Sequence, residues 1–148
     1  MALSNDPTTT DHLSRIVQNW NKGEEDRYKL NDSDFVFSAP TVNPKPLVAP
    51  GGNTIVEAKT LATSSKIGIS HIYYDRVNLA ELPSPPLITK NQNTTIADVI
   101  AQLNDYYGLY IVADDYDTTA SVAGSSVTVT AKATSYMFIG QVTLTFAA

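Results

Sequence analysis

The sequence predicts an α+β protein, in which a β-sheet or small sandwich formed by two related hairpins carries one packed helix, with a helical arm at the N-terminus. Two segments of strand-like residues repeat the same short motifs, and an amphipathic segment with helical spacing lies between them. A shorter helical stripe lies near the N-terminus and precedes a proline-rich stretch. We therefore expect an N-terminal arm over residues 1–30, an extended proline-rich tether over 31–52 and a β-rich body over 53–148.

The N-terminal arm is predicted to contain a short amphipathic helix. Asp11 or the threonine before it can cap the start. The apolar side chains recur at the spacing of one helical face, at Leu13, Ile16, Val17 and Trp20. A helix of about ten residues is not stable alone in water, so this stripe must dock on the body or on a neighbouring chain. An adhesion module folds around such a stripe, whereas a part of a larger assembly leaves it uncovered until it meets its neighbour.

The tether is predicted from its prolines. The strand-like segment Asp34–Ser38 leads into a stretch, residues 39–52, that contains four prolines and ends in two glycines. Proline lacks the N–H group that a β-ladder needs, and it fixes φ. We therefore expect an irregular, extended segment that lies along a surface, with Pro44 and Pro46 among its contact residues.

The body contains an internal echo of short motifs. The pattern V-x-A-K occurs at 56–59 and again at 129–132, and an Ile-Gly pair follows each copy, at 67–68 and at 139–140. Each half then continues as an alternating strand that ends in an aromatic residue. The echo predicts two β-hairpins with a glycine early in the second strand, where it suits a bulge or the close approach of another backbone. We interpret it as a duplication or a structural pseudo-symmetry, and a chance likeness of two Thr/Val-rich hairpins is the alternative.

A helix is predicted over residues 95–108. Thr95 and Asp98 have the spacing of a capping box, and Gly108 stands where helices commonly end. A further strand is predicted directly after it, over Leu109–Val112. The apolar face of the helix consists of Ile96, Val99, Ile100, Leu103 and Tyr107.

The composition excludes several classes of function. With 148 residues, ten basic against fifteen acidic side chains and a net charge of −5, the chain lacks the basic surface that nucleic acids or anionic membranes require. The absence of cysteine excludes disulfides, thiolate zinc sites, Fe–S clusters and cysteine nucleophiles, and it leaves the redox compartment open. The N-terminal residues lack the pattern of a secretory signal, and no apolar stretch approaches the ~20 residues that cross a bilayer. We expect neither nucleic acid nor a membrane as a partner.

Candidate catalytic and metal-binding residues are few. His12 and His71 lack the spacing of a metal site, so we expect them to be structural or solvent-facing. The acidic loop with Asp114, Asp115 and Asp117 is expected to cap turns, with calcium binding as the alternative. No G-x-S-x-G or phosphate-binding glycine motif occurs, and the carboxylate pair of a glycosidase cannot be placed from the sequence. We expect a protein without enzymatic activity, metal or cofactor.

Tyrosine is abundant, with eight residues that include the pairs Tyr73-Tyr74 and Tyr106-Tyr107. Adjacent side chains diverge, so one tyrosine of each pair can enter the core while the other is presented outward. An amphipathic ring suits protein interfaces, which makes Tyr74 and Tyr106 interface candidates. Stacking of these rings on a carbohydrate is the alternative.

Three groups of motifs in the body occur in an order that can be compared with known proteins. The run from Ile67-Gly68 through Tyr74-Asp75-Arg76-Val77-Asn78-Leu79 is similar to G-x-V-x-V-Y-Y-N-R-hydrophobic-x-L, with Asp75 where Asn is expected. The helix 95–108, with Leu103-Asn104, then Tyr107-Gly108 and later Asp114-Asp115, is similar to a helix followed by L-N-x-x-[YF]-G and x-x-D-D. Val127–Leu144 matches V-T-V-x-A-x-x-x-S-x-x-[YF]-x-G-x-V-x-[VL]. In this order the motifs resemble small modules of tailed-phage virion structural proteins, over residues 53–146.

The resemblance implies a non-enzymatic building block of a phage particle, made in the host cytoplasm and located in the virion. We expect a multi-copy component of the tail, the baseplate or the fibre attachment, a homo-oligomer that also contacts other virion proteins through its body and its arm. A head (capsid) decoration protein is the alternative within the particle, and a carbohydrate-binding or adhesion module is the alternative from another class. The interface candidates are Leu13, Ile16, Val17, Trp20, Pro44, Pro46, Tyr74 and Tyr106.

Overall fold

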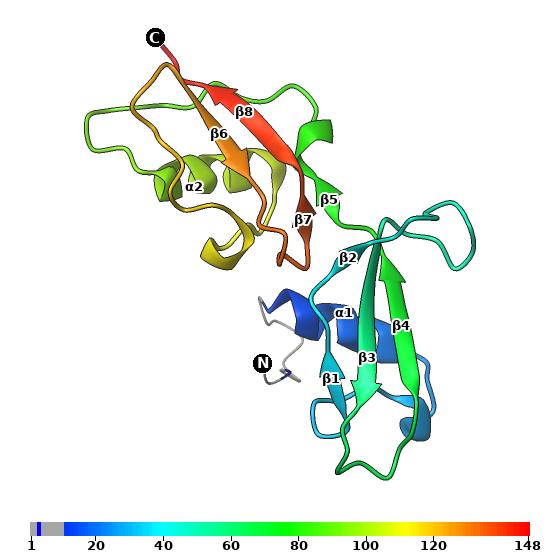
Figure 1. Cartoon of the computed structure of the whole chain (residues 1–148). Helices are drawn as coiled ribbons and strands as arrows, with labels where there is room; N and C mark the ends of the chain where they lie inside the picture. The colour runs from blue at the N-terminus through cyan, green and yellow to red at the C-terminus, as the bar shows by residue number, and fades with distance from the viewer. Residues whose placement is uncertain (1–2, 4–10) are drawn as a thin grey trace. The chain divides into compact units, whose positions relative to one another are not determined.

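The computed structural model describes Leu3 and residues 11–148. The chain forms two compact units, Met1–Asp75 and Arg76–Ala148, and each combines helices with small β-sheets, which confirms the α+β class (Figure 1). The predicted boundary between tether and body, at residues 52 and 53, is wrong. The first hairpin of the predicted body shares a unit with the predicted arm and tether, because strands of the tether pair with it.

The sheet of the first unit is built around strand β3 (Thr54–Thr60). Strand β4 (Ile69–Tyr74) pairs antiparallel with one edge of β3, which confirms the first predicted hairpin. Strands β1 (Phe35–Phe37) and β2 (Thr41–Val42) pair antiparallel with the other edge. Every second side chain along β3 is buried over most of its length, which places the core on one face of this sheet.

The predicted tether therefore forms one side of the sheet. The registers of β1 and β2 against β3 differ by one residue, so an extra residue lies between the two strands. This bulge contains Pro40, which is tolerated because a bulge leaves a residue outside the ladder. The strand predicted at Asp34–Ser38 is confirmed by β1, whereas the irregular structure expected over residues 39–52 is wrong for β2. The rest of this segment, including the loop after β2 with the exposed residues Pro44 and Pro46, is irregular.

The helix of the predicted arm, α1 (His12–Asn21), belongs to the first unit. The Asp11 carboxylate caps it by accepting hydrogen bonds from backbone N–H groups of the first turn. Leu13 and Val17 are each 2% exposed, and Figure 1 shows α1 lying across one face of the sheet. These two residues are core residues and not the interface residues that the sequence predicts, because the sheet of their own unit supplies the apolar surface that they need.

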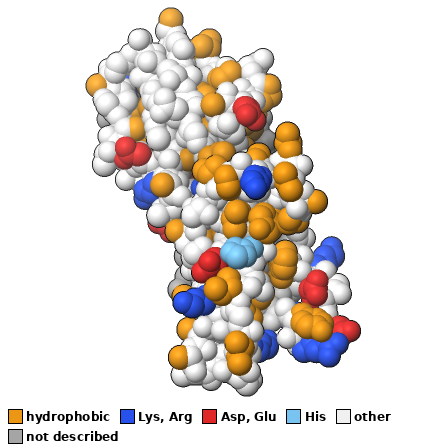
Figure 2. Space-filling model, turned by 45° about the vertical axis from the view of Figure 1, so that its right-hand side comes forward, with side chains coloured by type: hydrophobic (Ala, Val, Ile, Leu, Met, Phe, Trp, Pro, Cys, Tyr) orange, Lys and Arg blue, Asp and Glu red, His pale blue; other side chains and the backbone are white. Residues whose placement is uncertain are grey.

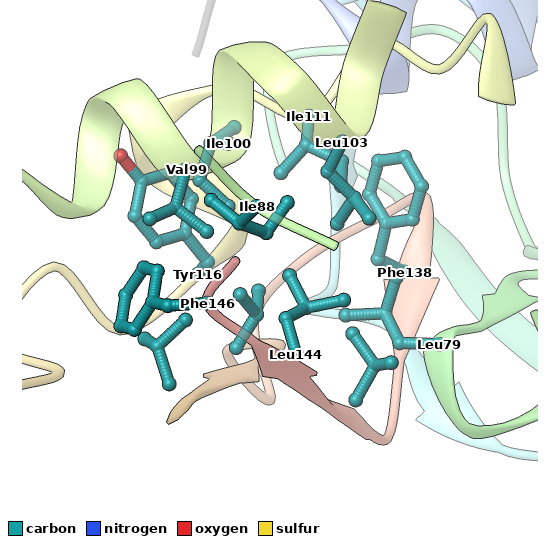
Figure 3. Close-up of a cluster of buried hydrophobic side chains, with 13 residues drawn as sticks. Leu79, Ile88, Val99, Ile100, Leu103, Ile111, Tyr116, Phe138, Leu144 and Phe146 are labelled. Carbon is teal, nitrogen blue, oxygen red and sulfur yellow. The ribbon is translucent and has the colours of Figure 1, made fainter. Parts of the chain in front are cut away.

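The second unit combines helix α2 (Ile96–Tyr107) with an antiparallel hairpin of β6 (Ser126–Thr130) and β8 (Gln141–Thr145). Strand β5 (Val77–Asn78) pairs in parallel with β7 (Phe138–Ile139), which leads into β8. Apolar side chains from α2, β6, β7 and β8 form its core, and Figure 3 shows them converging. The 3₁₀ helices of the described residues are η1 (Asp26–Tyr28), η2 (Leu79–Glu81) and η3 (Ala113–Asp115).

Helix α2 begins and ends as the sequence predicts. Thr95 and Asp98 form both hydrogen bonds of the capping box, and a left-handed glycine follows the last turn. The predicted strand over Leu109–Val112 is wrong. The Asn104 side chain accepts the N–H of Ile111 at 2.9 Å and donates to its C=O at 3.0 Å, so it occupies backbone groups that a β-ladder would use.

The two hairpins of the echo are present, but they are not copies in the same register. Val56 lies opposite Ile72 in the first hairpin. By the echo Val129 should lie opposite Leu144, yet it lies opposite Val142, two residues away. A shift by two residues keeps each side chain on its face and changes its cross-strand partner. Pseudo-symmetry therefore holds for the type of hairpin and its buried face, and it fails for the pairing.

Candidate interaction surface

Polar residues of the body motifs meet inside the second unit. The Arg76 guanidinium donates from Nη1 to the C=O of Ser135 at 3.0 Å, and the Ser135 hydroxyl donates to Asp115 Oδ1 at 2.7 Å. Asp115 Oδ2 accepts the N–H of Val112 at 3.0 Å. The arginine, serine and aspartate are all buried, where polar groups need such partners. These motif residues hold the second unit together.

The acidic loop has the same structural role. Asp117 accepts hydrogen bonds from the hydroxyl and the N–H of Thr119, at 2.6 and 2.9 Å, and these bonds lower its pKa. Asp115 and Asp117 both accept backbone N–H groups of their own loop, which confirms the prediction that aspartates of this loop cap turns for these two of the three residues. Within the described residues, no group of three or more His, Cys, Asp or Glu side chains is arranged to hold a metal ion. A membrane-spanning helix is also not found among them.

The two histidines occupy different environments. His12 is buried at the start of α1. His71 is exposed, as predicted for a solvent-facing residue, and its Nε2 lies 3.6 Å from Oε2 of Glu57 on the neighbouring strand. The imidazole of His71 therefore has a carboxylate neighbour on the surface of the first unit.

The tyrosine pair on α2 diverges as predicted. Tyr107 packs against the core of the second unit, its hydroxyl donates to the C=O of Pro83 at 2.7 Å, and burial raises its pKa. Tyr106 is exposed, and its ring meets that of Tyr107 edge-on. The outward-facing ring of this pair is available for contact with another molecule.

The predicted interface residues do not define one surface. Those that are exposed are Trp20, Pro44, Pro46 and Tyr106, and those that are half-buried are Ile16 and Tyr74. The exposed residues belong to three separate segments, which are the end of α1, the loop after β2, and α2.

A clearer candidate is the outer face, by which we mean the face of the first unit's sheet opposite its buried side chains. Val36 of β1, Lys59 of β3 and Ile69 of β4 lie side by side across it. Ile55 of β3 lies beside Tyr73 of β4. Val36 and Ile69 are 53% and 54% exposed, and Figure 2 shows hydrophobic side chains (orange) near a histidine (pale blue). Exposed apolar side chains gathered on one face make the outer face a candidate surface for contact with another protein.

Sequence reasoning missed the outer face. Both alternate sets of side chains in β4 contain apolar residues, Ile69 and Tyr73 in one set and Ile72 and Tyr74 in the other. The two-residue period therefore does not distinguish the outer face from the core face. The one signal was His71, whose polar ring belongs to the outer set.

The outer edge of β4 is open in the part of the chain that the structure describes. The N–H of Thr60 donates to the C=O of Gly68 at 3.2 Å, and this bond fixes which residues of β4 face β3. By the alternation of an antiparallel ladder, the N–H and C=O groups of Ile69, His71 and Tyr73 point the other way. The side chains of these three residues belong to the outer face, so the open edge and the apolar surface meet along one strand.

In the second unit, a loop segment bonds to one end of each edge of the β6–β8 hairpin. On β6, the C=O of Thr130 accepts the N–H of Asp117 at 2.9 Å. On β8, the C=O of Thr145 accepts the N–H of Ile88 at 2.9 Å. Short loop segments thus occupy backbone groups that could otherwise pair with another chain. The open edge of β4 differs from them in having no such cover among the described residues.

Comparison with known proteins finds one family. A family of unknown function (DUF7941) matches residues 5–148. No curated protein matches the chain, and no solved structure matches it.

Proposed function

Given that the chain belongs to DUF7941, a family of unknown function, we propose that it is a non-enzymatic structural protein of a tailed-phage virion, present in many copies. The observation that carries this proposal is the outer face together with the open edge of β4. Exposed apolar side chains beside outward-pointing backbone groups form a surface that other proteins cover in an assembly.

The motif residues give a second line of support. Arg76, Asp115 and Ser135 come from three separate parts of the resemblance and meet in one buried network. Their polar groups bond to one another and to backbone instead of facing a substrate. Motifs that maintain a fold in this way suit a building block of a particle.

Within the particle we propose the tail, the baseplate or the fibre attachment, where a small β-rich module can serve in a ring-like connector. Copies of the chain and other virion proteins would join through complementary surfaces. The N-terminal segment would contribute to these contacts through its exposed residues Trp20, Pro44 and Pro46. Leu13 and Val17 do not take part, because they lie in the core. Decoration of the head is the alternative location.

Mass spectrometry of purified particles tests this function. Particles from a lysate of the virus that carries this sequence are banded in a density gradient and washed at high salt, and their heads and tails are separated. We expect the chain in the tail fraction in several copies per particle. Recovery with heads alone selects the decoration role, and recovery only as free protein contradicts a virion role.

Carbohydrate binding is the second candidate function, favoured by two tyrosines of the second unit. Tyr106 and Tyr110 are 57% and 61% exposed, and an exposed ring can stack on a sugar. The burial of the α1 stripe within its own unit also suits a module that works without an assembly. Titration with a glycan panel tests this role, with Tyr106→Ala as the variant and the similarly exposed Tyr28→Ala as its control. Loss of binding in the first variant alone would favour it.

A further inference from the structure

We propose that the β4 strands of two copies of this chain pair antiparallel about a two-fold axis at His71, so that two first-unit sheets become one continuous sheet. The inference rests on the proposed function, and it names one partner in the assembly as a second copy of the chain. It follows from the backbone of β4, from its side chains and from its differences from the other strand edges.

The backbone determines the register. The outward-pointing residues of β4 are Ile69, His71 and Tyr73, and an antiparallel partner must place its own outward-pointing residues opposite them. With His71 opposite itself, Ile69 faces Tyr73 of the second copy and Tyr73 faces Ile69. A register displaced by two residues leaves one of the three without a counterpart. Because each facing pair exchanges two hydrogen bonds, the symmetric register forms the most.

The side chains are complementary in the same register. A cross-strand pair of an aromatic and a β-branched residue stabilises an antiparallel sheet, and the pair of Ile69 with Tyr73 forms twice by symmetry. At the axis the two His71 rings are neighbours, and each lies beside Glu57 of its own copy, with 3.6 Å between Nε2 and Oε2. Across the contact between the two copies, the order of side chains is Glu57, His71, His71, Glu57. The two carboxylates are therefore separated by the two imidazoles and do not face each other.

Several features favour β4 over the other edges of the described residues. β4 has six residues, whereas β1 has three and β2 has two. Loop segments occupy backbone groups on both edges of the β6–β8 hairpin. β4 contains neither lysine nor proline, which proteins use to protect an exposed edge. A two-fold contact of this kind presents the same surface from both copies.

Two double variants of the full chain test the register. Ile69→Lys with Tyr73→Lys places lysine opposite lysine in both pairs, whereas Ile69→Lys with Tyr73→Glu places lysine opposite glutamate. Analytical ultracentrifugation over a concentration series measures the dimer. We expect the wild type and the lysine–glutamate variant to dimerise. We expect the lysine–lysine variant to dimerise roughly a hundredfold more weakly.

A matched control separates pairing by edges from stacking by faces. Val36→Lys adds a lysine to the outer face on β1, away from the open edge of β4. We expect this variant to dimerise like the wild type, and far-UV circular dichroism checks that every variant is folded. Loss of the dimer in Val36→Lys would overturn edge pairing in favour of face-to-face stacking.

Amide hydrogen exchange gives a readout that needs no substitution. In the wild type, the amides of Ile69, His71 and Tyr73 should exchange more slowly as the protein concentration rises. The amides of Ser70 and Ile72, which face β3, should change little. A wild-type chain that stays monomeric and shows no concentration dependence at the three outward amides overturns the proposal.

The two proposals can fail separately. If the wild type is monomeric but the chain is found in purified particles, the virion role stands and β4 does not pair with a second copy. If the wild type dimerises through β4 but is absent from particles, the pairing stands and the virion role fails. Dimerisation that both double variants retain would mean that copies associate through another surface, which also overturns the pairing.

Discussion

Asp34 links two segments of the first unit through its carboxylate. It accepts hydrogen bonds from the Asn31 side chain at 3.0 Å and from the Ser64 hydroxyl at 2.8 Å, and Lys66 Nζ lies 3.1 Å away. These contacts lower the pKa of Asp34 to about 2, with the bond from Asn31 contributing most. The carboxylate thereby joins the residues before β1 to the loop between β3 and β4.

The first unit should lose stability in acid through Asp34. Its folded pKa lies below the ordinary value of 3.8, so its contribution is complete above about pH 4 and disappears as the pH falls toward 2. Asp34→Asn should be less stable than the wild type at pH 7 and nearly equal to it at pH 2. Urea unfolding followed by fluorescence of Trp20, the single tryptophan, reports on this unit. Asp114→Asn, an exposed residue of the second unit, is the control, and an equal deficit at both pH values would contradict this account.

Asp115 should matter more to stability than its neighbour in the sequence. Asp115→Ala removes the acceptor of the buried Ser135 hydroxyl, which costs about 1–3 kcal/mol for a buried group left unsatisfied. It also removes the acceptor of the part-buried Val112 N–H. Asp114→Ala, at an exposed position, should change the free energy of unfolding by less than about 0.5 kcal/mol. Guanidinium unfolding followed by far-UV circular dichroism compares the two. Equal effects would show that the buried network contributes nothing.

At the scale of elements, the sequence predicts best where the signal is local. The capping box and the closing glycine identify α2, and the alternation of small motifs identifies both hairpins. The predicted strand over Leu109–Val112 fails because the side chain of Asn104 supplies bonds that propensity does not report. The prediction of an irregular tether fails for a related reason. Proline is excluded from a β-ladder only at positions where its missing N–H group would have to donate a hydrogen bond, and the bulge at Pro40 has no such position.

Removal of the cap should weaken α2 without disturbing the first unit. The Thr95 hydroxyl accepts the N–H of Asp98 at 3.3 Å, and the Asp98 carboxylate accepts the N–H of Thr95 at 2.8 Å. Thr95→Ala should lower the free energy of unfolding of the second unit by about 1 kcal/mol. Thr118→Ala, in an exposed loop, is the control. Chemical denaturation monitored by hydrogen exchange along α2 measures the difference, and an unchanged helix would show that tertiary packing alone determines where it begins.

At the scale of the whole molecule, the sequence predicts the individual helices and hairpins better than it predicts which of them belong to the same unit. The pairing of β1 and β2 with β3 joins residues far apart in the chain and leaves no local pattern. The candidate surface is hidden for the same reason, since an edge can be recognised as open only when the other strands have been placed. The helical period predicts that the Tyr106 side chain is exposed, whereas no pattern in the sequence predicts that the side chains of Ile69 and Val36 are exposed.

The second unit should fold without the first, because it has its own core. We expect a fragment of residues 76–148 to give a dispersed ¹H–¹⁵N spectrum whose peaks overlie those of the full chain for most of these residues. A fragment that begins at Asn53 should give the same peaks plus disordered signals from residues 54–74, since their hairpin would lack α1, β1 and β2. A collapsed spectrum for residues 76–148 would contradict the division at Asp75.

The cover of the β6–β8 hairpin has a consequence for how far an assembly can grow. A subunit with one reactive end is a chain terminator in polymer chemistry, and a subunit with two reactive ends propagates. Pairing through β4 uses up the open edge of each copy, so growth by that contact stops at two. A change that displaced the segment around Ile88 and left β4 in place would uncover the end of a second strand edge. Such a chain would become a bifunctional monomer, and its product would be a fibril instead of a closed pair.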